Sequence, residues 1–312
     1  MAGAAIVTGG AGFIGSHVVD ALLARGEDVT VIDDLSTGTR ERVSPGAHFE
    51  QLDVVELDPL QALFEEVRPD SVYHLAAQAS VVESAKHPGR DCDVNVKGTL
   101  HVLEAAERHR APVVFTSTGG ALYGNAAPRP TAETEVPAPL SPYGASKWAA
   151  EAYVNTWTNA SAIPHAICRL GNVYGPRQSP HGEAGVVSIL TYHLYSNEVP
   201  RLFGHGRPTR DYVYVGDVVR ALLAARGHAG TYNIATGQAT DVATIWQQLS
   251  AAAGKRIEPK LEGLRPGELQ DSCLDPSRAE RELGWKPEVG IEEGLRITYE
   301  ALIHEFDGRA RA

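Results

Sequence analysis

The chain has few cysteines and no long apolar run. Its three cysteines, Cys92, Cys168 and Cys273, are widely spaced, and none belongs to a Cys-x-x-Cys motif. A small, odd number of cysteines argues against a disulfide framework and against a zinc site. We therefore expect no metal and a reducing, cytoplasmic environment. No stretch approaches 18 uninterrupted apolar residues, and no basic segment opens the sequence. We therefore expect neither a membrane-spanning helix nor a signal peptide.

Positive charge is also scarce. Lysine and arginine total 28 and aspartate and glutamate 39, which gives a formal net charge of −11. This balance excludes a general attraction to nucleic acid or to an anionic membrane, so we expect neither as a partner. Hydrophobic residues make up 43% of the 312 residues, which excludes a disordered chain and suffices for a large core.

The first half of the sequence alternates two patterns. Short apolar runs typical of buried parallel strands are separated by segments with helical spacing, at residues 13–25, 57–66 and 96–108. The apolar runs cover residues 4–7, 28–32, 71–75 and 112–116. This alternation predicts an α/β fold with a Rossmann-type, doubly wound parallel sheet.

The alternation weakens after about residue 175. We predict a dinucleotide-binding domain over residues 1–175 and a smaller α/β substrate lobe over residues 176–312. The two are expected to be interleaved, with the apolar runs at 212–214 and 231–234 returning to the sheet. Five prolines in residues 126–142 predict a loop that is ordered by docking.

A glycine motif follows the first predicted strand. Gly9, Gly12 and Gly15 are spaced as Gly-x-x-Gly-x-x-Gly and open a predicted helix. Glycine permits a tight turn and lets the backbone approach a pyrophosphate at the helix N-terminus. Asp33 ends the second strand, where a carboxylate accepts hydrogen bonds from adenosine ribose hydroxyls and repels a 2′-phosphate, which favours NAD over NADP. Asp53 is placed either to meet adenine or to cap a helix.

Tyr143 and Lys147 form a Tyr-x-x-x-Lys motif. In a helix this spacing places both side chains on one face. A free tyrosine has a pKa near 10, and lowering it by about three units requires roughly 4 kcal/mol of differential stabilisation. The Lys147 charge and a positively charged nicotinamide are expected to supply it together, making Tyr143 a general base.

Taken together, the motifs resemble the extended short-chain dehydrogenase/reductase family over residues 6–293. Within that family the sequence is most similar to the NAD-dependent nucleotide-sugar epimerases, the UDP-glucose (UDP-galactose) 4-epimerases in particular. The motifs that carry the resemblance, besides those above, are residues 33–38, 74–78, 95–99, 172–177, 182–187, 210–213, 265–268 and 283–285.

The resemblance implies a set of site residues. Thr118, Tyr143 and Lys147 correspond to the catalytic group. The implied NAD contacts are Gly9, Gly12, Phe13, Ile14, Gly15, Asp33, Asp34, Asp53, Val54, Leu75, Ala76, Ala77, Gln78, Tyr143 and Lys147. The implied UDP-sugar contacts are Thr118, Tyr143, Asn172, Val187, Arg210, Arg265, Glu268 and Ser272. Arg177 is either a further phosphate contact or a salt-bridge residue.

The sequence departs from the family pattern near the sugar site. The strand at 169–172 carries Leu170 where an aromatic residue is usual, and the segment after Thr118 is one residue longer, with Gly119 and Gly120. Counting from the strand makes Thr118 the catalytic hydroxyl, whereas counting back from Tyr123 puts Gly119 there. We choose Thr118 because the chemistry needs a hydroxyl. Ser272 occupies a position whose size is expected to gate the C2 substituent.

The resemblance implies NAD-dependent 4-epimerisation of a UDP-sugar, UDP-glucose and UDP-galactose first, through a transient 4-keto intermediate. UDP-glucuronate and UDP-N-acetylglucosamine stay open as substrates. A nucleotide-sugar dehydratase is less favoured because Thr118 is not followed by an Asp-Glu pair. A non-catalytic NAD-binding protein is less favoured because it would have no need of Thr118, Tyr143 and Lys147 together. A homodimer through the helices near 96–108 and 145–158 is also implied.

Overall fold

Seven parallel strands form the main sheet, in the order β10-β6-β5-β4-β1-β2-β3. The structure is a computed structural model that describes residues 3–181, 185–264 and 269–311. The strand order reverses beside β1, which places a switch point between β1 and β4. The strands are β1 (Ala4–Thr8), β2 (Asp28–Asp33), β3 (His48–Gln51), β4 (Ser71–His74), β5 (Val113–Thr118), β6 (Ala166–Leu170) and β10 (Gly230–Ile234). The predicted α/β fold and its doubly wound sheet are confirmed.

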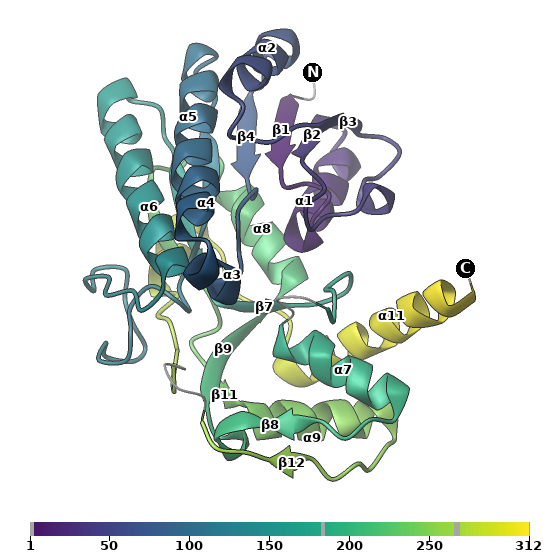
Figure 1. Cartoon of the computed structure of the whole chain (residues 1–312). Helices are drawn as coiled ribbons and strands as arrows, with labels where there is room; N and C mark the ends of the chain where they lie inside the picture. The colour runs from purple at the N-terminus through teal and green to yellow at the C-terminus, as the bar shows by residue number, and fades with distance from the viewer. Residues whose placement is uncertain (1–2, 182–184, 265–268, 312) are drawn as a thin grey trace.

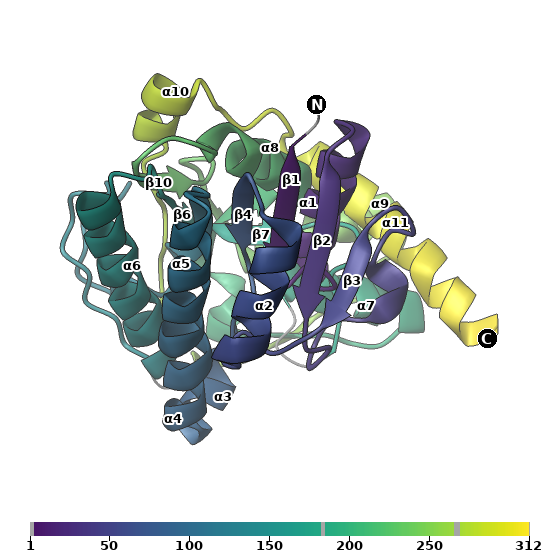
Figure 2. The ribbon, with the colours of Figure 1, turned by 90° about the horizontal axis from the view of Figure 1, so that it is seen from above.

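Helices cover both faces of this sheet (Figures 1 and 2). One apolar cluster joins the sheet to α1 (Phe13–Ala24) and α8 (Val215–Ala225), and a second joins it to α2 (Leu57–Val67), α5 (Gly98–Arg108) and α6 (Pro142–Ser161). Burial on both faces explains why the strands are continuous apolar runs. Two short helices, α3 (Val81–Lys86) and α4 (Pro88–Cys92), and the π-helical turn Asp93–Lys97 lead into α5, which therefore begins later than predicted.

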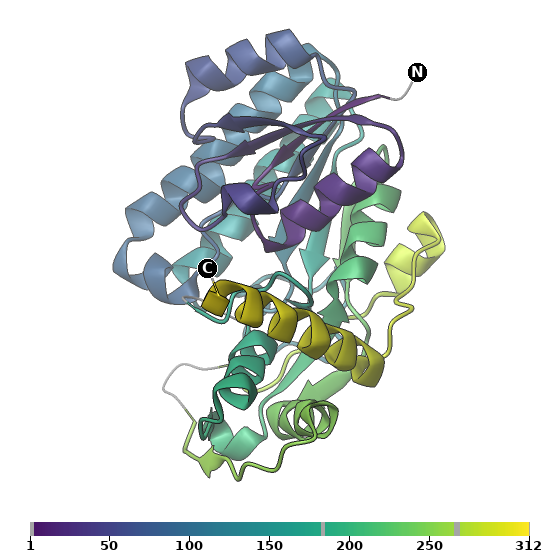
Figure 3. The same cartoon turned by 90° about the vertical axis from the view of Figure 1, so that its right-hand side faces the viewer.

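A smaller group of elements lies at the end of the main sheet (Figures 1 and 3). It contains a three-stranded sheet, β7 (Asn172–Tyr174), β9 (Thr209–Tyr214) and β11 (Ala239–Asp241), and a pair, β8 (Arg201–Leu202) and β12 (Lys260–Leu261). Three helices pack on these strands: α7 (Val186–Ser196), α9 (Val242–Ala253) and α11 (Ile291–Arg311).

The two apolar runs predicted to return to the main sheet behave differently. Residues 231–234 lie in β10 and pair with β6, as predicted. The prediction for residues 212–214 is wrong, because they belong to β9 and pair with β7 and β11. The physical reason is aromatic packing: Tyr212 and Tyr214 both lie edge-on to buried Tyr174 in the core of the smaller group.

The proline-rich stretch is a loop, as predicted, and residues 126–141 form neither helix nor regular strand. It is fixed by docking: Thr131 N donates to Cys273 O (2.9 Å), and Asp275 N donates to Thr131 O (2.9 Å). A short helix that follows, α10 (Ser277–Leu283), packs beside β10. Within the described ranges, none of the helices has the length and apolar character needed to cross a membrane.

Candidate active site

The glycine turn after β1 leaves no room for side chains. Gly9 has φ +71°, and a Cβ there would lie 2.6 Å from Ala76 N. A Cβ on Gly15 would lie 2.1 Å from Gly9 O. A side chain at either position would push α1 away from β1 and β4. The N-terminus of α1 is therefore held directly at the ends of the two central strands.

A cavity of about 840 Å³ opens at these strand ends. Every residue predicted to contact the cofactor lines it, from the glycine turn to Tyr143 and Lys147. Its place at the carboxyl ends of the strands, beside the switch point, is where doubly wound sheets bind ligands. Its size is in the range of small-molecule and cofactor sites.

The acidic residues of the cavity are held by the backbone. Asp33 accepts hydrogen bonds from Ala11 N and Leu35 N, both at 2.9 Å, and burial raises its pKa. Asp53 accepts from Val55 N (3.0 Å), whereas the N-cap of α2 is Glu56. The helix-cap alternative for Asp53 is thus wrong. A glycine turn at a helix N-terminus and a carboxylate ending β2 are the donors and acceptors that NAD needs, so these residues fit this cofactor.

Tyr143 and Lys147 lie in the first two turns of α6. Pro142 is its first residue, and the Ser141 hydroxyl accepts from Gly144 N (3.2 Å), which caps the helix. Thr118, at the end of β5, lies close enough to the Tyr143 hydroxyl to lower its pKa. Lys147 Nζ donates to Thr116 O at 2.9 Å. The motif on α6 and the end of β5 are thereby brought to one place.

Burial sets the ionisation of this pair. Burial raises the pKa of Tyr143 to about 12, the Thr118 side chain opposes this, and the Asp91 charge adds to it. Burial lowers the pKa of Lys147 to about 8, against the charges of Asp91 and Glu151. In the protein alone, Lys147 is not among the groups that shift the Tyr143 pKa, so the prediction that Lys147 and the nicotinamide lower it together stays a prediction. The Lys147 ammonium is engaged by a backbone carbonyl, and desolvation of the phenol outweighs other effects.

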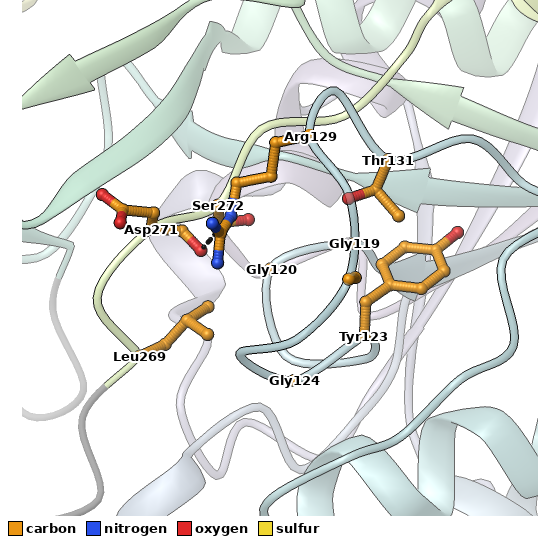
Figure 4. Close-up of a pocket in the computed structure, with 10 residues that line it drawn as sticks. Gly119, Gly120, Tyr123, Gly124, Arg129, Thr131, Leu269, Asp271 and Ser272 are labelled. Atoms are coloured by element: carbon orange, nitrogen blue, oxygen red, sulfur yellow. Dashed lines mark hydrogen bonds between the residues drawn. The ribbon is translucent and has the colours of Figure 1, made fainter.

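A second, much smaller cavity of about 10 Å³ adjoins the end of β5 (Figure 4). This is room for about one water molecule. It is lined by Gly119, Gly120, Tyr123, Gly124, Ala127, Arg129, Thr131, Leu269, Asp271 and Ser272. Figure 4 shows the Arg129 side chain extending toward Ser272 and Asp271, and Arg129 Nε donates to Asp271 O (3.2 Å).

The contact between β5 and Leu274 distinguishes the two possible catalytic positions. A Cβ on Gly119 would lie 2.2 Å from Leu274 Cδ1, so a side chain at this position would require Leu274 to shift. Thr118 lies close enough to Tyr143 to lower its pKa and also accepts from Ala121 N at 3.2 Å. The geometry therefore favours Thr118 as the hydroxyl beside Tyr143.

The other predicted sugar contacts do not all line one cavity. Asn172 begins β7 and Val187 is buried in α7, and neither lines a described cavity. Arg210 donates to the carbonyls of Thr209, Leu269 and Gln270 at 2.7–3.1 Å. Arg265 and Glu268 lie outside the described residues.

Arg177 takes the salt-bridge role of its two alternatives. Its guanidinium pairs with Asp20 at 2.6 Å, and its backbone N donates to Glu305 (3.0 Å). Among the described residues, no three His, Cys, Asp or Glu side chains cluster as metal ligands would.

The sequence reasoning missed several residues that line the large cavity: Ser36, Thr37, Arg42, Glu83, His87, Arg90, Gln178, Ser179, His181 and Gly185. Gln178 is notable because its buried Oε1 has no hydrogen-bond partner among the residues that the structure describes, while its Nε2 donates to Val173 O (3.0 Å). The sequence feature that could have identified Gln178 is its position just after Gly175-Pro176-Arg177, beyond the end of β7.

Comparison with known proteins agrees with this geometry. Residues 6–298 match the protein family described as GDP-mannose 4,6 dehydratase. A UDP-glucose 4-epimerase of Mycolicibacterium smegmatis is 43% identical over 304 residues, 95% of this chain and 97% of that protein.

Two solved structures are also similar. A UDP-glucose 4-epimerase of Thermotoga maritima, with UDP-glucose, is 42% identical with a TM-score of 0.95 over 97% of this chain and 99% of that one. A UDP-glucose 4-epimerase of Thermus thermophilus, in complex with NAD, is 42% identical with a TM-score of 0.89 over 96% and 98%. The chain therefore belongs to the GDP-mannose 4,6-dehydratase family of extended short-chain dehydrogenases/reductases.

Proposed function

We propose that this protein is an enzyme that interconverts UDP-glucose and UDP-galactose by NAD-dependent epimerisation at C4. The observation that carries the proposal is the placement of Tyr143 and Lys147 in the lining of a cavity that fits a dinucleotide, with Thr118 close enough to Tyr143 to lower its pKa. The 42–43% identity to UDP-glucose 4-epimerases over nearly the whole chain supports the same substrate.

The proposed chemistry divides between the cofactor and the protein. NAD, when bound, accepts the C4 hydride of the sugar and returns it to the opposite face. Tyr143 takes the proton of the 4-hydroxyl, and Thr118 orients that hydroxyl. Lys147, anchored on Thr116 O, presents its charge toward the cofactor side of Tyr143. Asn172, Val187, Arg210, Arg265 and Glu268 are proposed to hold the nucleotide while the 4-keto sugar turns.

The cavity wall argues against dehydration as the main reaction. Loss of water from a 4-keto sugar needs an acid and a base near C5 and C6. Thr118 is followed by Gly119 and Gly120, so the two positions directly after the catalytic hydroxyl carry no acidic side chain. The family description alone therefore does not decide the activity.

UDP-N-acetylglucosamine is a second candidate substrate. Ser272, Gly119 and Gly120 form the small-residue part of the lining of the small cavity, where a C2 substituent such as an N-acetyl group could be admitted, although Tyr123, Arg129 and Leu269 also line it. The cavity of about 10 Å³ is too small for that group as it stands, so the 269–274 segment would have to shift.

Three further features are part of the proposal. The first is a homodimer through α5 and α6, supported by Trp148 and Tyr153, which are 42% and 41% exposed on α6. The second is a division into interleaved domains over residues 1–175 and 176–312, in which α8 and β10 of the second range pack in the apolar cluster of the main sheet. The third is a cytoplasmic location, supported by three free cysteines.

An assay without added cofactor tests the function. The purified protein receives UDP-glucose, UDP-glucuronate or UDP-N-acetylglucosamine in separate tubes, and epimers are separated by chromatography. We expect UDP-galactose to form fastest. It should form without added cofactor, because bound NAD is regenerated in each turnover. Unchanged substrates in all tubes, even after NAD is added, would refute the proposal.

A further inference from the structure

A buried carboxylate, Asp91, lies next to the proposed base and has no role in the chemistry described above. Asp91 belongs to α4 and is only 1% exposed. Its Oδ1 accepts from Gln78 Nε2 (2.8 Å) and Asn95 Nδ2 (3.1 Å). In the ranges that the structure describes, it forms no ion pair with Lys or Arg. Burying a carboxylate without an ion pair costs free energy, so we expect Asp91 to have a function that offsets this cost.

Hydrogen bonds connect Asp91 to both sides of the site. Asn95 Nδ2 also donates to Gln78 O (2.9 Å) and to the Ser146 hydroxyl (3.0 Å), and Ser146 Oγ donates to Tyr143 O (3.0 Å). Gln78 lines the large cavity, in the loop after β4. Asp91 and Asn95 thus join the cofactor side of the cavity to the first turn of α6, against which α3 and α4 pack (Figure 1).

The charge of Asp91 also acts on the proposed base. It raises the pKa of Tyr143 and opposes the fall in the pKa of Lys147. The titratable and charged groups on the elements around this pair include His74, Glu83, Lys86, His87, Arg90, Asp91, Asp93, Lys97, Glu151 and His181. Among these, Asp91 is the one whose charge raises the Tyr143 pKa.

We propose that Asp91 is a positioning residue for the epimerisation, which fixes the start of α6, and with it Tyr143, against the cofactor-side loop. The inference rests on the proposed function, because it assigns Tyr143 as the base. Asp91 acts through Gln78, Asn95 and electrostatics rather than by touching the reacting atoms.

The variant D91N separates charge from hydrogen bonding. Its amide oxygen still accepts from Gln78 and Asn95, while the negative charge is lost. We expect the acidic limb of the kcat–pH profile to move to lower pH, on the order of half a pH unit. D93N removes an exposed carboxylate two residues away and should leave the profile unchanged. D91A should also lower kcat, because the Gln78 and Asn95 amides lose their acceptor.

A readout independent of activity completes the test. In protein labelled at tyrosine Cζ with ¹³C and purified with its cofactor, the Tyr143 signal is assigned by its loss in Y143F. We expect this signal to titrate at lower pH in D91N than in the wild type or in D93N. An unmoved titration and pH limb, or a D91N protein that fails to fold, would overturn the proposal. If D91N shifts the Tyr143 titration but the wild-type protein epimerises none of the substrates, the proposed function is refuted and the positioning role of Asp91 is not.

Discussion

The two sides of the active site are built in different ways. On the cofactor side, each predicted residue comes from the end of a strand of one sheet or the helix that follows, and all of them line one cavity. On the sugar side, Asn172, Val187, Arg210 and Ser272 lie on a small sheet, a helix and a loop, and they do not share a cavity. A single rigid sheet fixes positions through local geometry, whereas the sugar side depends on how separate segments dock.

The largest expected effect is a loss of kcat at Tyr143, where the cofactor side and the sugar side of the active site meet. Y143F removes the hydroxyl beside Thr118 that is proposed to act as the base, and it should lower kcat by about 10²–10⁴-fold. The fold and the bound NAD should be preserved, because the ring remains. Turnover is measured by chromatography and retained NAD by absorbance after denaturation. Wild-type turnover in Y143F would remove Tyr143 from the mechanism.

Next in size is the buried pair that attaches the sugar-side loops to the main sheet. Arg169 on β6 pairs with Glu151 on α6 at 2.6 Å and also donates to the Tyr123 hydroxyl and Glu133 O. E151A leaves this guanidinium buried and unpaired, so we expect a loss of about 3–5 kcal/mol in the free energy of unfolding.

Urea denaturation measures the effect of E151A. The matched control is E300A, which breaks the exposed Arg296–Glu300 pair and should cost less than about 1 kcal/mol. Similar losses in both variants would mean that the buried pair does not secure the loops.

A smaller effect is expected on the cofactor side. G15A places a Cβ at 2.1 Å from Gly9 O, so α1 must move away from the strand ends. We expect a loss of about 2–4 kcal/mol in stability and loss of retained NAD. G290A, at an open position, is the control. A G15A protein that keeps its NAD would contradict the close packing of this turn.

The smallest predicted effect concerns Lys147 and pH. Because its folded pKa of about 8 lies below the unfolded value of 10.5, its charge disfavours folding at all pH values below about 8. This destabilisation decreases between about pH 8 and pH 10.5, because the folded protein has already lost the Lys147 proton and the unfolded chain then loses it too. K147M should therefore be more stable than the wild type at pH 7, by roughly 2 kcal/mol, and less so at pH 10. A constant difference across this range in thermal melts would contradict the burial of an ammonium.

The same contrast explains how much the sequence could reveal. The glycine turn, Asp33 and the Tyr143–Lys147 spacing act through neighbouring residues, so their places in the sheet followed from local patterns. The sequence predicts residues 212–214 as a strand of the main sheet because an apolar run does not indicate which strand it will pair with. Their place in the smaller sheet depends on packing against Tyr174, more than 30 residues earlier in the chain. The network of Asp91, Gln78 and Asn95 likewise needs a fold to bring it together.

The central claim is that C4 of the sugar is oxidised and reduced again within one active site. Its most direct test is turnover of UDP-glucose carrying deuterium at C4, in ordinary water and without added NAD, followed by mass and NMR analysis of the product. The account predicts UDP-galactose that keeps its deuterium at C4, because the hydride never exchanges with solvent. Product that has lost the deuterium to water, or a sugar that never inverts, would contradict it.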